Sequence, residues 1–510
     1  MSPCVTIHHL PDELLVEIVN ILREQKSLSP PWFHLTFVCH RWRAVILDYP
    51  LFWTKINATG DIERTQSFLE RSKSFPIDLT ISDYPSQDIQ RRSLTSLLSD
   101  HIHRIKYLTL KPRYAEDVMQ RIDSPFPILE WLNLERESGD SPLIVRFGIS
   151  PPAPRLKYLW ISRSTLDWNS SLYKGLSSLS LSSAFRAEPF VGDFLNVLEA
   201  CPSLENLRLK DFHLREFIPE DFFEEGDVIP DDFTIPEDPR TIELPLLKKC
   251  YVSGYCESIA NLLRHIDIPS CSRVSLWFLP GYDRQTSDRF WVLPSDLHTH
   301  MPLVPHSTDM QLTSRLHNLY PQFEGAQWNT DLVLTAPEVS GQPNLWIYVP
   351  LVYKDIKPNF FESAFALVQP FSITTLKIEF DFTCVTRRMW REALTGLRSL
   401  VTLRITAAHC KAQCISAAPA EVYNVLGTKA DAHQVICPKL EQLHLRHVNL
   451  GPVTARLLHI ALQLRALSNA KLQYLDIDDW HSRGEVQWEW PDFLKVADEF
   501  SQNKRDAETF

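Results

Sequence analysis

The feature that most constrains the fold of this chain is a six-residue apolar phrase, L-x-x-L-x-L, in which Ile, Val or Cys sometimes replaces Leu. It recurs at 105–110, 129–134, 156–161, 176–181, 204–209, 247–252, 271–276, 373–378, 400–405, 440–445 and 472–477. Its last two apolar positions alternate as in a β-strand, so they share one face and their neighbours point to the other. Amphipathic helix patterns lie between several phrases, which predicts stacked strand–helix units rather than one compact core.

The spacing of the phrases resembles that of leucine-rich repeats. The middle positions of the first five phrases are 24, 27, 20 and 28 residues apart, mostly within the 20–29-residue period of that class. Two features depart from it: Phe212 and Val448 replace the usual Asn or Cys, and three spacings stretch to 43, 102 and 40 residues. The sequence therefore predicts an α/β fold with an irregular, degenerate leucine-rich-repeat solenoid over residues 59–480. A generic α/β domain with leucine-rich strands is the alternative.

The stretched spacings locate the insertions. An acidic loop is predicted at 213–242, because Glu216–Asp238 holds ten acidic residues and no basic one, too polar to form a core. An irregular insertion is predicted at 279–371. It is expected to keep repeat-like strands in disguised form, with a mobile stretch near residues 298–308 between them. Residues 481–510 are predicted to be a C-terminal cap or tail, which a stacked array requires.

A second informative stretch spans residues 10–53. Pro11 suits the first turn of a helix, and the acidic residues Asp12 and Glu13 suit the helix dipole. Apolar residues then cover more than one helical stripe between 14 and 22, and a helix pattern from Cys39 ends at Pro50. The stretch predicts three small helices with more apolar surface than they can bury among themselves.

Three blocks in this stretch resemble the F-box motif: Leu-Pro-x-Glu-Leu-Leu from Leu10, Val-Cys-x-x-Trp-Arg from Val38, and Pro-Leu-x-Trp from Pro50. A longer joint at 27–31 departs from the usual pattern. The resemblance covers residues 1–58 and implies three helices that dock on the Skp-family adaptor of a cullin-RING ubiquitin ligase. The residues it implies for adaptor contact are Leu10, Pro11, Leu14, Leu15, Ile18, Val38, Cys39, Trp42, Leu51 and Trp53. A helical cap that closes the core of the next domain is the alternative.

The segment that follows also carries a resemblance. Phe68–Ser72 leading into Pro76–Ile81 is similar to the segment after the F-box in many fungal F-box proteins. It favours a fungal F-box-like type.

Composition excludes several classes of function. The net charge of −11 argues against general nucleic-acid binding, which needs a basic surface. No apolar run approaches a membrane span, and the start lacks a secretory signal pattern. Ten scattered cysteines then suit reduced thiols, so a cytoplasmic or nuclear location is expected.

Motifs for chemistry are missing. Glycine is scarce, 14 in 510 residues, and neither phosphate-binding glycine motifs nor G-x-S-x-G or H-E-x-x-H occurs. A loose group of Cys and His residues is a possible zinc site: it consists of His409, Cys410, Cys414, His433 and Cys437. Its spacing and its lack of knuckle residues do not fit a structural zinc site. We therefore predict no catalytic residue, no metal and no cofactor.

Side chains beside the inward leucines predict a recognition surface. Aromatic residues and arginine are enriched in interface hot spots, and they recur at these outward positions. The predicted target-binding residues are Trp131, Tyr158, Trp160, Arg208, Tyr251, Trp277, Arg404 and Arg446. The alternative is that helices, loops or the 279–371 insertion cover them.

Together these features predict a non-enzymatic, substrate-recognition subunit of an SCF-type ubiquitin ligase. Its partners would be the Skp-family adaptor, through it a cullin, and an unknown protein target marked for ubiquitin-dependent degradation. An interaction scaffold that binds the adaptor without degrading its partner is the alternative.

Overall fold

The computed structural model divides the chain into two compact units, residues 1–187 and 188–510, which are treated separately. The structure describes residues 10–24, 32–58, 61–81, 88–110, 125–135, 143–145, 153–182, 189–212, 240–254, 256–278, 309–317, 327–335, 345–351, 361–362, 364–366, 372–380, 385–407, 420–429, 434–448, 452–479 and 497–504. The predicted acidic loop, apart from residues 240–242, and the stretch 298–308 lie outside these residues.

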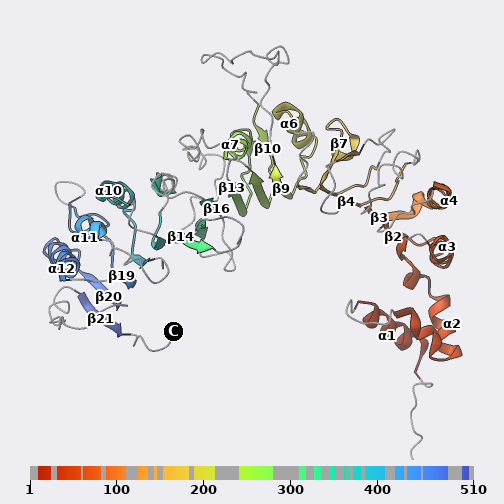
Figure 1. Cartoon of the computed structure of the whole chain (residues 1–510), viewed down its shortest axis with the longest axis horizontal. Coiled ribbons are helices and arrows are strands. Elements are labelled where there is room, and N and C mark those ends of the chain that lie inside the picture. Colours follow the sequence, from red (N-terminus) through yellow and green to blue (C-terminus); the bar gives the residue numbers. More distant parts are fainter. Residues whose placement is uncertain are drawn as a thin grey trace, which may run out of the picture. The chain divides into compact units, whose positions relative to one another are not determined.

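The first unit begins with helices. They are α1 (Asp12–Glu24), the 3-10 helix η2 (Trp32–Phe37), α2 (His40–Asp48) and the 3-10 helix η3 (Pro50–Trp53) (Figure 1). Pro50 opens η3 at the point where α2 has ended, as its fixed φ and missing N–H require. The expected helical N-terminal region is therefore confirmed.

A parallel sheet follows in the same unit. Successive strands pair in chain order: β1 (Lys55–Ala58), β2 (Ile77–Ile81), β3 (Ile105–Leu110), β4 (Trp131–Glu135), β6 (Tyr158–Ser162) and β8 (Ser178–Ser182). Strands β5 (Leu143–Val145) and β7 (Ser164–Leu166) form a separate parallel pair. The unit also contains α3 (Ile62–Arg71), α4 (Asp88–Ser99) and the 3-10 helices η4 (Ile102–Arg104) and η5 (Ser171–Tyr173).

The second unit repeats the strand–helix arrangement. Its parallel strands are β9 (Asn206–Phe212), β11 (Lys249–Gly254), β13 (Arg273–Phe278) and β16 (Leu345–Leu351), then β17 (Thr375–Phe380), β18 (Thr402–Ala407), β19 (Gln442–Val448), β20 (Leu472–Asp479) and β21 (Ala497–Lys504). Its helices are α6 (Val191–Glu199), α7 (Cys256–Arg264), α10 (Arg387–Gly396), α11 (Ala420–Leu426) and α12 (Pro452–Leu467), with α11 and α12 on one side of β19 and β20 (Figure 1). Strands β10 (Ile242–Glu243) and β12 (Ile266–Asp267) form a small parallel pair.

The predicted 279–371 insertion contributes strands to this sheet. Strands β14 (Asp309–His317) and β15 (Gln327–Thr335) are antiparallel, as are β15 and β16. Because β16 also pairs with β13 and β14 with β17, the described strands of this region continue the sheet. Strand β21 likewise extends the sheet past residue 480, where the sequence placed the end of the repeats.

The recurring phrase supplies the core of both units. All three apolar positions of every phrase are at most 5% exposed, including those occupied by Cys250 and Cys271. A shared hydrogen-bond pattern stacks the turns before the strands: one carbonyl accepts from two successive amides of the next turn. Glu130 O accepts from residues 157 and 158 in the first unit, and Glu441 O from residues 473 and 474 in the second.

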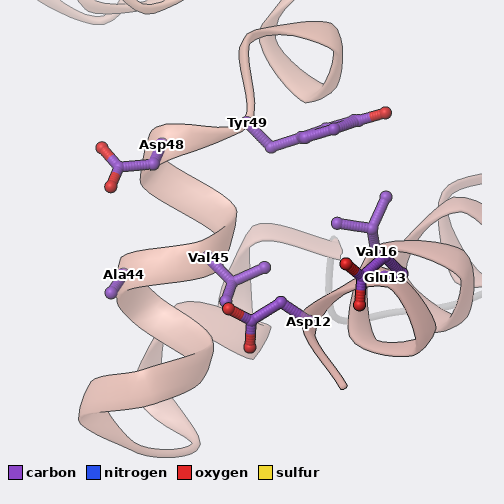
Figure 2. Close-up of a pocket in the computed structure, with 7 residues that line it drawn as sticks. All are labelled: Asp12, Glu13, Val16, Ala44, Val45, Asp48 and Tyr49. Atoms are coloured by element: carbon purple, nitrogen blue, oxygen red, sulfur yellow. The ribbon is translucent and has the colours of Figure 1, made fainter.

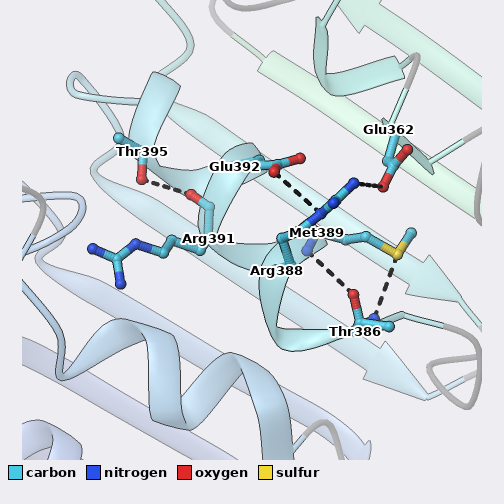
Figure 3. A network of polar contacts seen from close by, with 7 residues as sticks. All are labelled: Glu362, Thr386, Arg388, Met389, Arg391, Glu392 and Thr395. Atoms are coloured by element: carbon cyan, nitrogen blue, oxygen red, sulfur yellow. Dashed lines mark hydrogen bonds and ion pairs between the residues drawn. The ribbon is translucent and has the colours of Figure 1, made fainter.

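The ends of the helices are set by local polar contacts. At the start of α10 the Thr386 hydroxyl accepts a 3.4 Å bond from the Met389 amide, and the Thr386 amide donates to Met389 Sδ (Figure 3). Arg388 lies 3.3 Å from Glu392 one turn later and 3.9 Å from Glu362. These exposed ion pairs add little energy, so the threonine cap fixes where α10 begins.

Two buried arginines close helix C-termini, where backbone carbonyls lack intrahelical partners. Arg104 donates to the carbonyls of Leu69, Lys73 and Phe75 and to Ser72 Oγ at the end of α3. Arg465 is fully buried and donates to three carbonyls at the end of α11 and beyond it: Leu426 at 3.4 Å, Ile436 at 2.6 Å and Cys437 at 2.9 Å. Burial lowers the pKa of each guanidinium. In both cases carbonyl oxygens accept from the two terminal nitrogens, whereas the buried Nε has no hydrogen-bond partner.

The architecture agrees with the coarser expectation: a helical N-terminal region followed by parallel α/β structure. The finer assignment to a leucine-rich-repeat solenoid stays a prediction at this point.

We expect Arg465→Ala to lower the free energy of unfolding of the second unit by roughly 2–5 kcal/mol, because it leaves three buried carbonyls unsatisfied. Arg456→Ala removes an exposed arginine from the same helix and should change it by less than about 0.5 kcal/mol. Denaturant unfolding of both variants, followed by hydrogen exchange in α11 and α12, measures the difference. Equal effects would contradict a structural role for the buried guanidinium.

Candidate functional site

Helix α1 carries two apolar stripes that serve different purposes. Leu15 and Val19 are at most 1% exposed, whereas Leu14 and Ile21 are about half exposed (50% and 51%). One stripe runs through Leu15 and Val19 and the other through Leu14 and Ile21, and each follows i, i+4, i+7 spacing. At 3.6 residues per turn the two stripes lie roughly 100° apart around the helix. One stripe therefore folds this region and the other faces outward.

The buried stripe packs into a small core of its own. Leu15 and Val19 meet Trp42 and Ile46 of α2 and the aromatic pair at the end of η3, Phe52 and Trp53. The Trp53 indole donates a 3.0 Å bond to Ile46 O, so its polar atom is satisfied inside the core.

Trp53 also joins the helices to the rest of the first unit. Its ring meets Phe68 of α3 edge to face at 4.9 Å, and the Arg71 guanidinium lies 4.6 Å from its centroid. The N-terminal helices therefore have an internal core and a fixed attachment to α3. What is left outside that core is available to a partner.

The remaining large apolar side chains form what we call the exposed apolar set. Its members lie on α1, η2, the α2 entry and η3, and each is at least 40% exposed: Leu14, Ile21, Phe37, Val38 and Leu51. Single exposed apolar residues are ordinary. Five within one short helical region make that region a candidate interaction surface.

The structure separates the predicted adaptor-binding residues into two groups. Leu15, Trp42 and Trp53 are at most 5% exposed, so their side chains support the fold and offer no contact area. The others are exposed or half-buried: Leu10, Pro11, Leu14, Ile18, Val38, Cys39 and Leu51.

Two members of the exposed apolar set were missed by the sequence analysis. Ile21 follows Leu14 and Ile18 at helical spacing, so the signal was present in the sequence. Phe37, 73% exposed, lies in the dense apolar run that also supplies half-buried Leu35. Only its position in η2 shows that it points outward.

Two arginines hold the helices in register. Arg41 of α2 forms a 2.6 Å ion pair with Asp12 and donates to Leu10 O. Arg23 at the end of α1 donates a 2.8 Å bond to Leu51 O. Through these bonds Leu10 and Leu51, at opposite ends of the motif, are tied to the helices that carry the rest.

A shallow groove of about 490 Å³ lies between α1 and α2 (Figure 2). Three carboxylates surround an apolar floor there, and the lining residues are Asp12, Glu13, Val16, Ala44, Val45, Asp48 and Tyr49. None of them belongs to the exposed apolar set, so the acidic groove and the apolar surface are separate features.

A second candidate surface lies on the sheet of the first unit. Tyr107, Trp131 and Tyr158 occupy one register row across β3, β4 and β6, and Trp160 lies in the next outward row, opposite Asn133. Trp131 and Tyr158 stack at 5.2 Å. Tyr107, Tyr158 and Trp160 are each 38–42% exposed. We call these four residues the aromatic row. Tyr107 was missed, although it precedes its inward leucine as Trp131 and Tyr158 do.

The second unit carries the other predicted target-binding residues. The Arg208 guanidinium lies 5.0 Å from the Tyr251 ring, and Tyr251 lies 6.2 Å from Trp277. Arg446 is bonded at 2.5 Å to the buried Asp476, and Arg404 is exposed. These contacts group Arg208 with the two aromatics.

Asp476 lies beneath Arg446. Its Oδ2 also lies 3.3 Å from His444 Nδ1 and accepts from it when that nitrogen carries the ring proton. Burial lowers the pKa of His444, which keeps the imidazole neutral near pH 7. The arrangement is that of a buried structural ion pair.

The described part of the chain offers no candidate metal site. It holds no cluster of three or more His, Cys, Asp or Glu residues that could bind a metal ion. Of the Cys/His group considered for zinc, only Cys437 is described; burial raises the pKa of its thiol to about 12, and its Sγ donates to Leu394 O. None of the described helices is long and apolar enough to cross a membrane.

Comparison with known proteins identifies the N-terminal region alone. Residues 7–59 match the family model for an F-box-like domain. Domains of this kind generally bind Skp-family adaptors. No curated protein matches the chain. The F-box assignment is thereby confirmed, and the fungal type stays a prediction.

We expect Leu15→Ala and Leu14→Ala to distinguish the stripe of α1 that stabilises the fold from the stripe that is exposed. Leu15→Ala removes a core side chain and should cost about 2–5 kcal/mol of stability. Leu14→Ala alters an exposed one and should cost less than about 0.5 kcal/mol. Hydrogen exchange of the α1 and α2 amides in the full chain measures both, and comparable losses of protection would refute the division into two stripes.

Proposed function

We propose that this protein is the substrate-recognition subunit of an SCF-type cullin-RING ubiquitin ligase. The observation that carries the proposal is an F-box-like domain whose own core leaves five large apolar side chains exposed. A surface of this kind suits docking on a Skp-family adaptor, which would connect the chain to a cullin.

The proposed contact depends on burying the exposed apolar set as a whole. Fully burying one exposed leucine-sized side chain contributes roughly 1.5–3 kcal/mol, and the five members of the set have 40–73% of their surface left to bury. Association costs about 4–15 kcal/mol in lost freedom. The surplus is sufficient only if most of the set is buried together, which favours contacts from α1, η2 and η3 at once.

The rest of the chain is proposed to be an irregular leucine-rich-repeat solenoid. Two features of both units support this assignment: inward positions buried without exception, and parallel pairing of most successive phrase strands. In the first unit the phrases are also spaced within the period of that class. The antiparallel strands β14 and β15 are the irregular element.

Target binding is proposed for the sheet surface. The aromatic row in the first unit and the Arg208–Tyr251–Trp277 group in the second offer the residue types that dominate interface hot spots. Rigid aromatic side chains lose little conformational entropy on binding. Of the predicted target-binding residues, Arg446 is the least suitable, because it is already paired with Asp476.

The proposed contribution of this chain to ubiquitin transfer is proximity. Holding a target near a charged enzyme makes the transfer effectively intramolecular, and the chain itself needs no catalytic group. Depletion of the adaptor distinguishes this role from that of a scaffold. A ubiquitination target should accumulate on depletion, whereas the level of a scaffold partner should not change.

We expect the double substitution Leu14→Lys, Leu51→Lys to weaken binding to a Skp-family adaptor at least 100-fold, because it removes two apolar contacts and introduces charge into the interface. Isothermal titration with the purified full chain measures the affinity. Leu246→Lys, at a similarly exposed leucine in the second unit (51%), is the matched control and should bind normally. Undiminished affinity of the double variant would reject this docking surface.

We also expect Tyr158→Ala with Trp160→Ala to reduce capture of targets at least tenfold while leaving adaptor affinity unchanged, since both rings are exposed and outside the core. Quantitative affinity purification of the wild-type and variant chains, with Phe190→Ala as the control for an exposed aromatic elsewhere (40%), makes the comparison. An unchanged set of captured proteins would exclude the aromatic row as the target site.

A further inference from the structure

Helix α12 is apolar on two sides. Toward the protein it buries Ala455, Leu458 and Leu462. On another side it exposes Val453 (71%), Ile460 (51%), Leu464 (45%) and Leu467 (83%), with half-buried Leu457 between them. We call these five residues, Val453, Leu457, Ile460, Leu464 and Leu467, the α12 seam.

Most of the α12 seam points away from the residues on which the helix packs; only Leu464 approaches its flank, with Cδ1 3.5 Å from a Cβ atom built on Gly427. At roughly 100° per residue its five members fall within an arc of about 80°, on the opposite side from the three buried residues. Helix α11 takes up a flank, where a Cβ atom built on Gly427 would lie only 2.9 Å from Ala461 Cα. The seam therefore lies on the outer surface of the helix layer.

The spacing of the seam identifies the kind of surface that would cover it. Successive members are 4, 3, 4 and 3 residues apart, which is the 3.5-residue period of a and d positions in a coiled coil. A second α-helix that crosses at about 20° matches this period, because its side chains insert between the rows of seam side chains. An irregular protein surface has no such repeat to match it.

Charge indicates which helix fits. Residues 452–467, PVTARLLHIALQLRAL, contain no Asp or Glu. Arg456 is exposed beside the seam, whereas Arg465 is buried on the carbonyls of Ile436 and Cys437. A second copy of α12 would bring arginine toward arginine with no acidic partner, which is unfavourable. A helix with acidic residues flanking its apolar stripe would complement Arg456.

We propose that the α12 seam is the docking site for an amphipathic α-helix of another protein, with apolar residues in heptad spacing and acidic residues beside them. This site is separate from the exposed apolar set and from the aromatic row. It provides the chain with a further partner beyond the proposed adaptor and the target held on the sheet.

The test uses the full chain and two synthetic peptides of four heptads. Both peptides have Leu at a and d; one has Glu at e and g and the other has Lys there. Repulsion between like charges limits pairing of each peptide with itself. Fluorescence anisotropy should give a dissociation constant at least tenfold lower for the glutamate peptide. Ile460→Asp with Leu464→Asp should weaken its binding at least tenfold.

Two controls make the result specific. Leu246→Asp, at an exposed leucine away from α12, should leave peptide binding unchanged. Arg456→Glu should lower the affinity for the glutamate peptide and raise the affinity for the lysine peptide. Adaptor affinity should be normal in every α12 variant, so failure here is distinguishable from failure of the proposed F-box role.

Three outcomes would overturn the proposal: equal affinity for the two peptides, no binding of either, or glutamate-peptide binding that survives both aspartate substitutions. Sedimentation velocity supplies a fourth. If the full chain dimerises and Ile460→Asp abolishes the dimer, the seam is an interface between copies of this chain and the partner-helix proposal is wrong.

Discussion

Burial of three apolar side chains per phrase is the interaction on which both units depend. In nine of the eleven phrases the first residue lies in the turn before a strand and the other two lie on the strand itself; Ile105 and Leu472 instead begin β3 and β20. All of them are essentially excluded from water. A single strand and helix could not bury these side chains alone, so each layer completes the core of its neighbour. Parallel pairing follows from this demand, because every strand enters from an equivalent turn.

The need to satisfy buried backbone carbonyls explains the two buried arginines. Short helices packed on a sheet end in carbonyls that water cannot reach. Arg104 and Arg465 supply several donors from one rigid group and satisfy those carbonyls at α3 and α11. The charged group is buried as a consequence of its hydrogen bonds, and its location at a helix C-terminus is where the dipole favours a cation. Neither arginine has a place in a functional site.

The surfaces that remain are of two kinds. On α1 and on α12, one helix is apolar on two sides, and only one of them is covered by the chain. On the sheet, the aromatic row is exposed because its side chains alternate with the buried leucines of the phrases and point to the other face. The F-box-like domain, the aromatic row and the α12 seam would provide separate contacts in the proposed functions.

The sequence by itself determined the inward positions of the phrases, the helical start and the F-box motif, because each depends on short periodic patterns. It also indicated that α1 has too much apolar surface. Tertiary structure alone decided which part of the apolar surface is buried. Trp42 and Trp53 belong to the motif, yet their side chains lie in the core, whereas Phe37 faces outward. The part played by β14–β16 in the sheet was likewise beyond local pattern, since strand pairing joins residues far apart in the chain. Periodicity fixes which residues share a face, but only the packed neighbours determine whether that face is covered.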